Sequence, residues 1–303
     1  MSSLIRRALL TVALSSLLCA AALAQAPQLR GFPTAEAAAD ALTDAIRKKD
    51  DKALTAILGA TWNELAPGND QEDEETRAKF LKAWDESHKI LPQGADRAQV
   101  GVGTTGWVSP LPIVKQGSEW RYDVAAGRKE VQARAIGRNE LAVVQTLLAV
   151  IDAQRDYATI DPMKTGMNVY ARRLLSSPGK MDGLYWETKP GEPASPLGPL
   201  VAKAQPGEVQ EKGYFGYRFR LLYSQGPDAP GGAHDYLVKG RMIGGFALIA
   251  WPVKYGETGV MTFIASHSGD VYEQDLGPDT AQEAAAISVF NPDKDWAKAD
   301  MTP

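Results

Sequence analysis

The residues of this chain best suited to acid–base chemistry are two of its three histidines. His234 and Asp235 directly follow Gly231-Gly232-Ala233, and glycines allow the main chain to approach a bound group closely. A histidine beside a carboxylate can take a proton from water or from a hydroxyl group, which is the chemistry of a hydrolase. His267 would join this pair if both histidines lay at the same end of one sheet. His234, Asp235 and His267 are therefore candidate binding residues, and the alternative is a flexible polar loop.

The serines around His267 do not extend this site into a catalytic triad. Ser266, Ser268 and Asp270 are neighbours in a predicted tight turn, where adjacent side chains point apart. The chain also lacks the G-x-S-x-G sequence that presents a nucleophilic serine in many hydrolases. We therefore assign no catalytic residue.

Metal-binding patterns are also missing from the sequence. The histidines show no H-x-x-x-H or H-E-x-x-H spacing. The acidic run 70–75 offers oxygen atoms for calcium but lacks the Asp-x-Asp-x-Asp-Gly loop of an EF-hand. Acidic residues at the start of a helix also complement the helix dipole, which explains the run without a metal. We expect neither a metal ion nor another cofactor.

Tyr185 and Trp186 are candidate contact residues of a second kind. Exposed tryptophans bind sugars and peptide strands by stacking and burial, although most of the seven tryptophans are expected in the core. This pair lies among the residues of a segment, 176–206, that is rich in Pro, Gly and Ser and is predicted to be a long surface loop. That position favours an exposed pair that binds a partner.

The elements that must position these residues begin with helices. Thr34 is a suitable N-cap for an amphipathic helix, and a second short helix is predicted after Asp51. A third helix is predicted from Asp73, with His88 on its apolar face. The alternating residues of 111–123 predict a β-hairpin.

The remainder of the chain combines one strong helix with a sheet. Apolar residues of 140–157 recur at helical spacing, and Leu141, Val144, Leu148 and Ile151 form one stripe. Short alternating segments predict an antiparallel sheet, followed by a short Ala-rich helix at 280–287. The predicted strands are 214–223, 245–253, 259–265 and 271–275. The sequence thus predicts an α+β protein: N-terminal helices with a small hairpin sheet, then a long helix packed on an antiparallel sheet.

Several motifs resemble a known family. They are Asn139-Glu140-Leu141, Asp182-Gly183-Leu184-Tyr185-Trp186, Gly216-Tyr217-Arg218-Phe219, and the segment from Ala250 to Phe263. In this combination the chain is similar to exported bacterial proteins grouped as domain of unknown function 2950. The resemblance covers nearly the whole chain after its first residues. It implies export and a shared fold, and it supplies no catalytic residues.

The second half also resembles the globular domains of type IV pilins and pseudopilins. The resemblance rests on the helix that ends in Ala153-Gln154 and Tyr157 and on the later strands, including 252–263. It implies a helix packed on an antiparallel sheet. The chain lacks a prepilin cleavage site followed by a long apolar helix, which argues against assembly into a pilus shaft. We therefore predict an α+β domain over 25–126 and a pilin-like domain over 127–303.

The first residues have the pattern of a cleavable signal peptide. Arg6 and Arg7 precede an apolar run, and small residues place the cleavage site near Ala24 or Ala26. A signal peptide over residues 1–24 indicates Gram-negative-type export, to the periplasm or out of the cell. No later apolar run is long enough to span a membrane.

Charge and composition limit the classes of binding partner that we expect. The chain has 33 basic and 37 acidic residues, and cleavage would remove two of the basic ones. Since no basic stripe interleaved with aromatic residues is present, nucleic acid is disfavoured. We expect an exported, non-enzymatic interaction or assembly protein of the envelope, with envelope, secretion or pilus proteins as partners. The alternative is an envelope hydrolase or small-ligand-binding protein that uses His234, Asp235 and His267.

Overall fold

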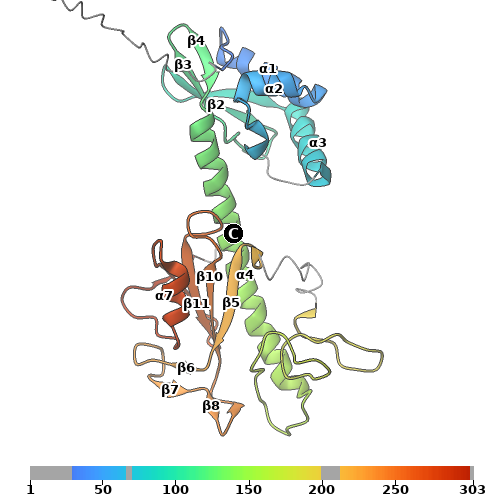
Figure 1. The fold of residues 1–303 in the computed structure, drawn as a ribbon, viewed down its shortest axis with the longest axis vertical. Helices are drawn as coiled ribbons and strands as arrows, with labels where there is room; N and C mark the ends of the chain where they lie inside the picture. The colour runs from blue at the N-terminus through green and yellow to red at the C-terminus, as the bar shows by residue number, and fades with distance from the viewer. Residues whose placement is uncertain (1–28, 66–69, 199–211, 301–303) are drawn as a thin grey trace, which may run out of the picture. The chain divides into compact units, whose positions relative to one another are not determined.

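The computed structural model describes residues 29–65, 70–198 and 212–300 (Figure 1). The chain divides into two compact units, Met1–Val124 and Ala125–Pro303, and each has a hydrophobic core of its own. The predicted signal peptide lies outside the described residues. None of the described helices combines the length and the apolar character that crossing a bilayer requires.

The first unit opens with helices, as the sequence predicts. Thr34 caps the first of them, because its side chain accepts a hydrogen bond from Ala37 N at 3.1 Å. Ala38 and Ile57 are fully buried and contribute to the core of this unit. The helices are α1 (Ala35–Lys48), α2 (Asp51–Leu58), the 3-10 helix η1 (Trp62–Leu65) and α3 (Asp70–Glu86).

Four antiparallel strands complete this unit in the order β1-β2-β3-β4. They are β1 (His88–Pro92), β2 (Arg97–Val102), β3 (Ile113–Gln116) and β4 (Glu119–Tyr122). The last two strands form the hairpin predicted within 111–123. The helical assignment of His88 is wrong, because the chain leaves α3 after Glu86 and His88 pairs with Val102. Its ring still stacks on Trp84, with ring centroids 4.0 Å apart.

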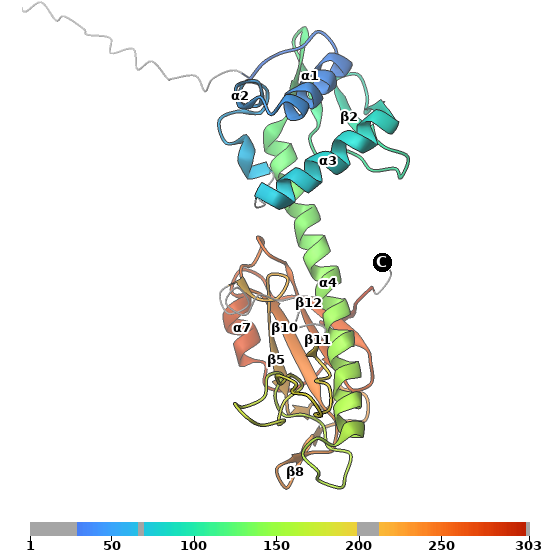
Figure 2. The same cartoon turned by 90° about the vertical axis from the view of Figure 1, so that its right-hand side faces the viewer.

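One long helix, α4 (Val124–Ile160), leads into the second unit and spans 37 residues (Figure 2). It includes the strong helix predicted over 140–157. The buried stripe of this half contains Val144, Leu147 and Ile151. Because these residues recur every three or four positions, one face of the helix is committed to the core.

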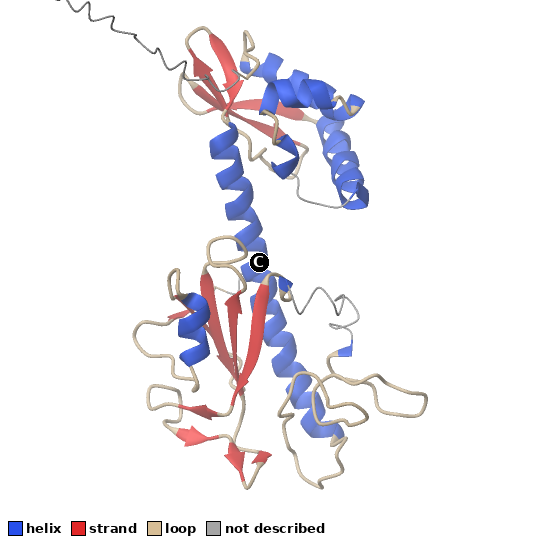
Figure 3. Cartoon of the chain, in the orientation of Figure 1, coloured by secondary structure: helices blue, strands red, loops and turns tan. Residues whose placement is uncertain are grey.

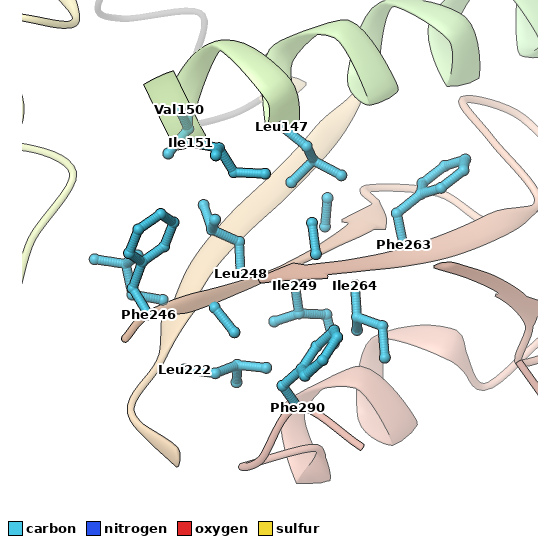
Figure 4. Packing of buried hydrophobic residues seen from close by; sticks show 14 of the residues in the cluster. Leu147, Val150, Ile151, Leu222, Phe246, Leu248, Ile249, Phe263, Ile264 and Phe290 are labelled. Carbon is cyan, nitrogen blue, oxygen red and sulfur yellow. The ribbon is translucent and has the colours of Figure 1, made fainter. Parts of the chain in front are cut away.

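That face packs on a five-stranded antiparallel sheet in the order β13-β12-β11-β10-β5. The strands are β5 (Tyr217–Leu222), β10 (Ala247–Pro252), β11 (Met261–Ser266), β12 (Val271–Asp275) and β13 (Ala297–Lys298). Figure 4 shows the two buried faces: Leu147 and Ile151 lie on the side of Leu248, and Phe290 lies on the side of Ile249. The helix α7 (Thr280–Ala286) lies on this second side.

Two short ribbons follow β5 at one end of the unit (Figure 1). β6 (Ser224–Gln225) pairs with β7 (His234–Asp235), and β8 (Leu237–Val238) pairs with β9 (Arg241–Met242). Helices and antiparallel strands occupy separate parts of each unit (Figure 3). The predicted α+β class is therefore confirmed.

Candidate functional site

The structure contradicts the expected exposure of Trp186. Its side chain is only 5% exposed and packs against Tyr157 at 6.4 Å between ring centroids. The indole N–H donates to Pro193 O at 3.1 Å, so the Pro/Gly-rich segment folds back and covers the ring. Tyr185 is half-buried beside the same core. The prediction of an exposed aromatic pair is wrong, because the loop supplies both the packing and the hydrogen-bond acceptor that the indole requires.

His234 and His267 both pack against the ring of Tyr236. The centroid distances are 5.4 Å for His234 and 5.7 Å for His267. His267 Nδ1 is buried and has no hydrogen-bond partner among the described residues. His234 is exposed, and its two ring nitrogens lie 3.2 Å from Gly232 O and 3.3 Å from Gly244 O. The two histidines thus share one aromatic neighbour.

Asp235 does not complete a catalytic pair in this arrangement. It is exposed in β7, and no hydrogen bond or ion pair in the described structure links its carboxylate to His234 or His267. Ser266 Oγ lies 3.0 Å from Ser268 Oγ, so these hydroxyl groups bond to each other. Across the described ranges, no group of three or more His, Cys, Asp or Glu residues is placed to hold a metal ion.

Three of the four motifs that carry the family resemblance form a polar network that holds α4 to the sheet. Glu140 Oε1 accepts hydrogen bonds from Val260 N at 2.8 Å and Met261 N at 2.9 Å. Asn139 Nδ2 donates to Thr258 O at 2.9 Å. Tyr217 donates to Met261 O, and burial raises the pKa of its hydroxyl well above the usual range, an effect that Glu140 adds to. These polar groups satisfy one another.

A cavity of about 490 Å³ lies in the same unit, near the end of α4 and the β8–β9 ribbon. A volume of this size is typical of sites for small molecules. Its lining is supplied by the end of α4, the following loop and the β8–β9 turn. The residues are Tyr157, Met163, Thr165, Val169, Tyr170, Arg172, Arg173, Asp182, Tyr223, Gly240 and Arg241. None of the five candidate binding residues predicted from the sequence lines this cavity, although Tyr157 and Asp182, which belong to the motifs named above, do.

Three arginines give this cavity its positive charge. Among the described residues, Arg172 donates to Gly240 O alone, at 3.3 Å, and Arg241 to the thioether sulfur of Met167 alone, at 3.2 Å. In the described part of the chain, neither these two nor Arg173 forms an ion pair. All three side chains are exposed to solvent. Guanidinium groups that form no ion pair are available to an anionic ligand.

One carboxylate, Asp182, lies among these cations. Burial raises its pKa, but hydrogen bonds from Ser177 N and Oγ and the charge of Arg173 outweigh burial, so the pKa is lowered overall. Asp182 is therefore ionised at neutral pH and held by Ser177. Nearby, burial and the charges of Asp182 and Asp161 raise the pKa of Tyr157 to about 12. The Tyr157 hydroxyl stays protonated and donates to Met181 O at 2.7 Å.

The wall that carries Arg172 and Arg173 is fixed to α4. Gln154 is completely buried, donates from Nε2 to Ala171 O at 2.9 Å and accepts from Ala171 N at 2.8 Å. Asp161 accepts hydrogen bonds from Thr165 N and Gly166 N, both at 2.8 Å, and the bond from Thr165 lowers its pKa. These hydrogen bonds tie the segment 161–171 to the end of α4.

A second, shallower cavity of about 280 Å³ adjoins the first. The two share Arg172, Arg173 and Tyr223. The second adds Leu174, Leu175, Phe219, Arg220 and Leu221. Arg220 is committed elsewhere, because it donates to Ala284 O at 2.8 Å and to Ile287 O at 2.7 Å.

The arrangement is suited to holding an anion beside aromatic and apolar groups. Ser177 binds the single carboxylate of the site. The Tyr157 hydroxyl keeps its proton at neutral pH, since its pKa is raised, and a protonated hydroxyl cannot act as a general base. Tyr157 and Asp182 belong to motifs named in the sequence, and the adjacent pair Arg172-Arg173, which follows the strong helix, is a further signal that the sequence reasoning did not use. The other residues are distant in sequence, and no pattern connects Arg241 or Tyr223 with that pair.

A family model described as a protein of unknown function, DUF2950, matches residues 29–299. This match confirms the predicted family resemblance. Neither the curated proteins nor the solved structures contain a match to the chain. The predicted likeness to pilins therefore stays a prediction.

Proposed function

The chain belongs to the DUF2950 family, and we propose that it is an exported, non-enzymatic binding protein of the bacterial envelope that holds an anionic ligand in the arginine-lined cavity. The observation that carries the proposal is the set of three arginines, Arg172, Arg173 and Arg241, around one cavity without carboxylate ion pairs in the described structure. The chain as a whole has a formal net charge of −4. The cavity has the opposite sign, which concentrates anions locally.

Export and a pilin-like architecture are parts of the same proposal. The sequence pattern of residues 1–24 supports export. Packing of α4 on the antiparallel sheet β13-β12-β11-β10-β5 supports the pilin-like arrangement, with a binding role in place of a pilus shaft. Release of the mature chain by osmotic shock, with an N-terminus at Gln25 or Pro27 in mass spectrometry, is the result expected. Retention of residues 1–24 on a cytoplasmic chain would contradict export.

The binding proposal is tested with citrate as a small, highly charged anion. We expect calorimetric titration of the chain from Gln25 onward to detect binding at low salt, and Arg173→Ala to weaken it about tenfold or more. Arg155→Ala is the matched control, because Arg155 is a solvent-exposed arginine of the same unit paired with Asp152. Equal losses of citrate affinity in the two variants would show that citrate binding depends only on general surface charge.

The shared contact with Tyr236 keeps the hydrolase alternative testable. His234 and His267 approach the same ring, and the unpartnered Nδ1 of His267 is a polar atom that a ligand could engage. Hydrolysis of model esters or phosphoesters that disappears in both His234→Ala and His267→Ala would favour this second function. Activity that persists in both variants would argue against these histidines.

A further inference from the structure

β5 forms one edge of the five-stranded sheet. Its only ladder partner is β10, with Phe219 opposite Ala250 and Leu221 opposite Leu248. In an antiparallel strand, successive residues direct their N–H and C=O groups alternately to the two sides. Half of the main-chain groups of β5 therefore point away from β10.

Hydrogen bonds at the two ends of β5 identify the residues whose main-chain groups point away from β10. Tyr217 exchanges two main-chain hydrogen bonds with Tyr214, at 2.9 and 3.1 Å, on the side away from β10. At the other end, Tyr223 O accepts from Tyr236 N at 2.9 Å. Because the direction alternates along the strand, the main-chain N–H and C=O groups of Phe219 and Leu221 point to the same side as those of Tyr217 and Tyr223. Within the described ranges, no hydrogen bond reaches the main-chain groups of Phe219 or Leu221 from this side.

The shallow cavity lies beside these two residues. Phe219 and Leu221 line it on one side, and the segment from Arg172 to Leu175 lines it on the other. Leu175 lines the cavity together with Phe219 and Leu221, and 60% of its surface is exposed. The cavity thus combines unpaired main-chain groups, an exposed apolar side chain and arginines shared with the larger cavity.

We infer that the edge of β5 is a docking site for a short, extended, acidic peptide segment of a partner protein. The peptide main chain pairs with Phe219 and Leu221, an apolar side chain covers Leu175, and carboxylates meet Arg172 and Arg173. Strand addition of this kind gains affinity from main-chain hydrogen bonds and specificity from the neighbouring side chains. The inference rests on the proposed function, since the same arginines hold the anionic groups of the peptide.

A peptide fits this edge better than an acidic sugar does. Phe219 and Leu221 are two residues apart, so their outward N–H and C=O groups repeat at the spacing of a β-strand. A peptide main chain presents acceptors and donors at that same spacing, whereas a sugar chain does not. The arginines select for acidic side chains in the added strand.

The test uses the hexapeptide Glu-Val-Glu-Val-Glu-Val with a fluorescent N-terminal label. We expect it to bind the chain from Gln25 onward and to slow hydrogen exchange at the Phe219 and Leu221 amides about tenfold or more. The same peptide methylated on alternate main-chain nitrogens should bind about tenfold more weakly, because it has lost donors to the edge. A Lys-Val hexapeptide tests the charge preference and should not bind.

Phe219→Pro provides the matched variant. Its missing N–H points away from β10, so the ladder with Ala250 is retained while the outer donor is lost. Phe219→Ala removes the same ring but keeps the N–H. We expect the proline variant to lose peptide binding and the alanine variant to retain it, with both folded by circular dichroism. Equal binding by the two variants would overturn strand addition.

Citrate separates this inference from the proposed function. If citrate binding depends on Arg173 but the peptide leaves the Phe219 and Leu221 amides unprotected, strand addition is wrong and anion binding stands. If neither citrate nor the peptide binds, both proposals fail. Binding of an oligogalacturonate in place of the peptide, without protection of these amides, would replace the peptide with an acidic sugar.

Discussion

Two polar regions of the second unit differ in how their charged groups are used. Around Glu140, the carboxylate accepts two main-chain hydrogen bonds, and Asn139 and Tyr217 complete the network. Around Arg172 and Arg173, the guanidinium groups border a cavity and have no ion-pair partner among the described residues. The motifs that carry the resemblances supply the whole of the first network, whereas in the second region they supply Tyr157 and Asp182 and none of the arginines. The difference teaches that motif residues can serve the fold, while a ligand site is revealed by polar groups that the fold leaves unpaired.

The largest effect is expected where the first region is most tightly packed. A Cβ atom on Gly259 would overlap the Tyr217 hydroxyl group. Gly259→Ala should therefore lower the free energy of unfolding by about 3 kcal/mol or more, measured by urea denaturation. Gly137→Ala is the control, because a Cβ at Gly137 meets nothing within 4 Å, and in a helix it should raise stability by about 0.5–1 kcal/mol. Similar losses in both variants would contradict the packing argument.

Loss of the Glu140 carboxylate should have the next largest effect. Glu140→Ala leaves the N–H groups of Val260 and Met261 without their acceptor, which should cost about 2 kcal/mol in the free energy of unfolding. Glu140→Gln keeps one acceptor oxygen and should lose less. If the alanine variant unfolds at the same urea concentration as the wild type, the network does not hold α4 to the sheet.

Tyr157, which lines the cavity, should make the free energy of unfolding depend on pH in the alkaline range. The pKa of Tyr157 is raised from 10.0 to about 12 in the folded chain, so its protonated hydroxyl contributes stability that is fully present below pH 10.0. That contribution is lost as the pH rises from 10.0 towards 12. Urea denaturation between these pH values should show a shallower loss of stability in Tyr157→Phe than in the wild type. Parallel curves would mean that the hydroxyl group titrates normally.

The smallest effect on stability is expected at the cavity rim. Arg241→Ala should change the free energy of unfolding by less than about 0.5 kcal/mol, since this guanidinium contacts only a thioether sulfur. Arg220→Ala should cost about 1–2 kcal/mol, because Arg220 donates to two carbonyl groups near the end of α7. Thermal or urea unfolding of the two variants compares an arginine that serves a ligand with one that serves the fold. A larger loss in Arg241→Ala would reverse that assignment.

Periodicity predicted the main elements of the second unit because each is stabilised by a repeating apolar face. The stripe that contains Val144 and Ile151 predicted the half of α4 that packs on the sheet. The same reasoning failed for His88, where pairing with Val102 in β1 prevailed over the helical spacing. The exposure expected for Trp186 rested on its position in a Pro/Gly-rich loop, and it was wrong because the acceptor at Pro193 O depends on how that loop folds back.

The cavity could not be predicted, because chain segments that are far apart create it. The wall is set by Gln154, whose buried amide pairs with the main chain of Ala171, a contact that helical periodicity does not encode. The convergence of Arg173 and Arg241 depends on the β8–β9 turn, which carried no strong sequence signal. Convergence of His234 and His267 on Tyr236 likewise became visible only in three dimensions.

The short unpaired stretch of β5 also bears on solubility. An open sheet edge invites pairing with other copies of the same chain, which leads to aggregation. Here Tyr214 blocks one end of the stretch and Tyr236 blocks the other, so only Phe219 and Leu221 lack a partner on that side within the described structure. So short an interval cannot nucleate a long intermolecular sheet, and the neighbouring arginines repel their counterparts on a second copy. The same edge is thus open to a foreign strand and resistant to self-association.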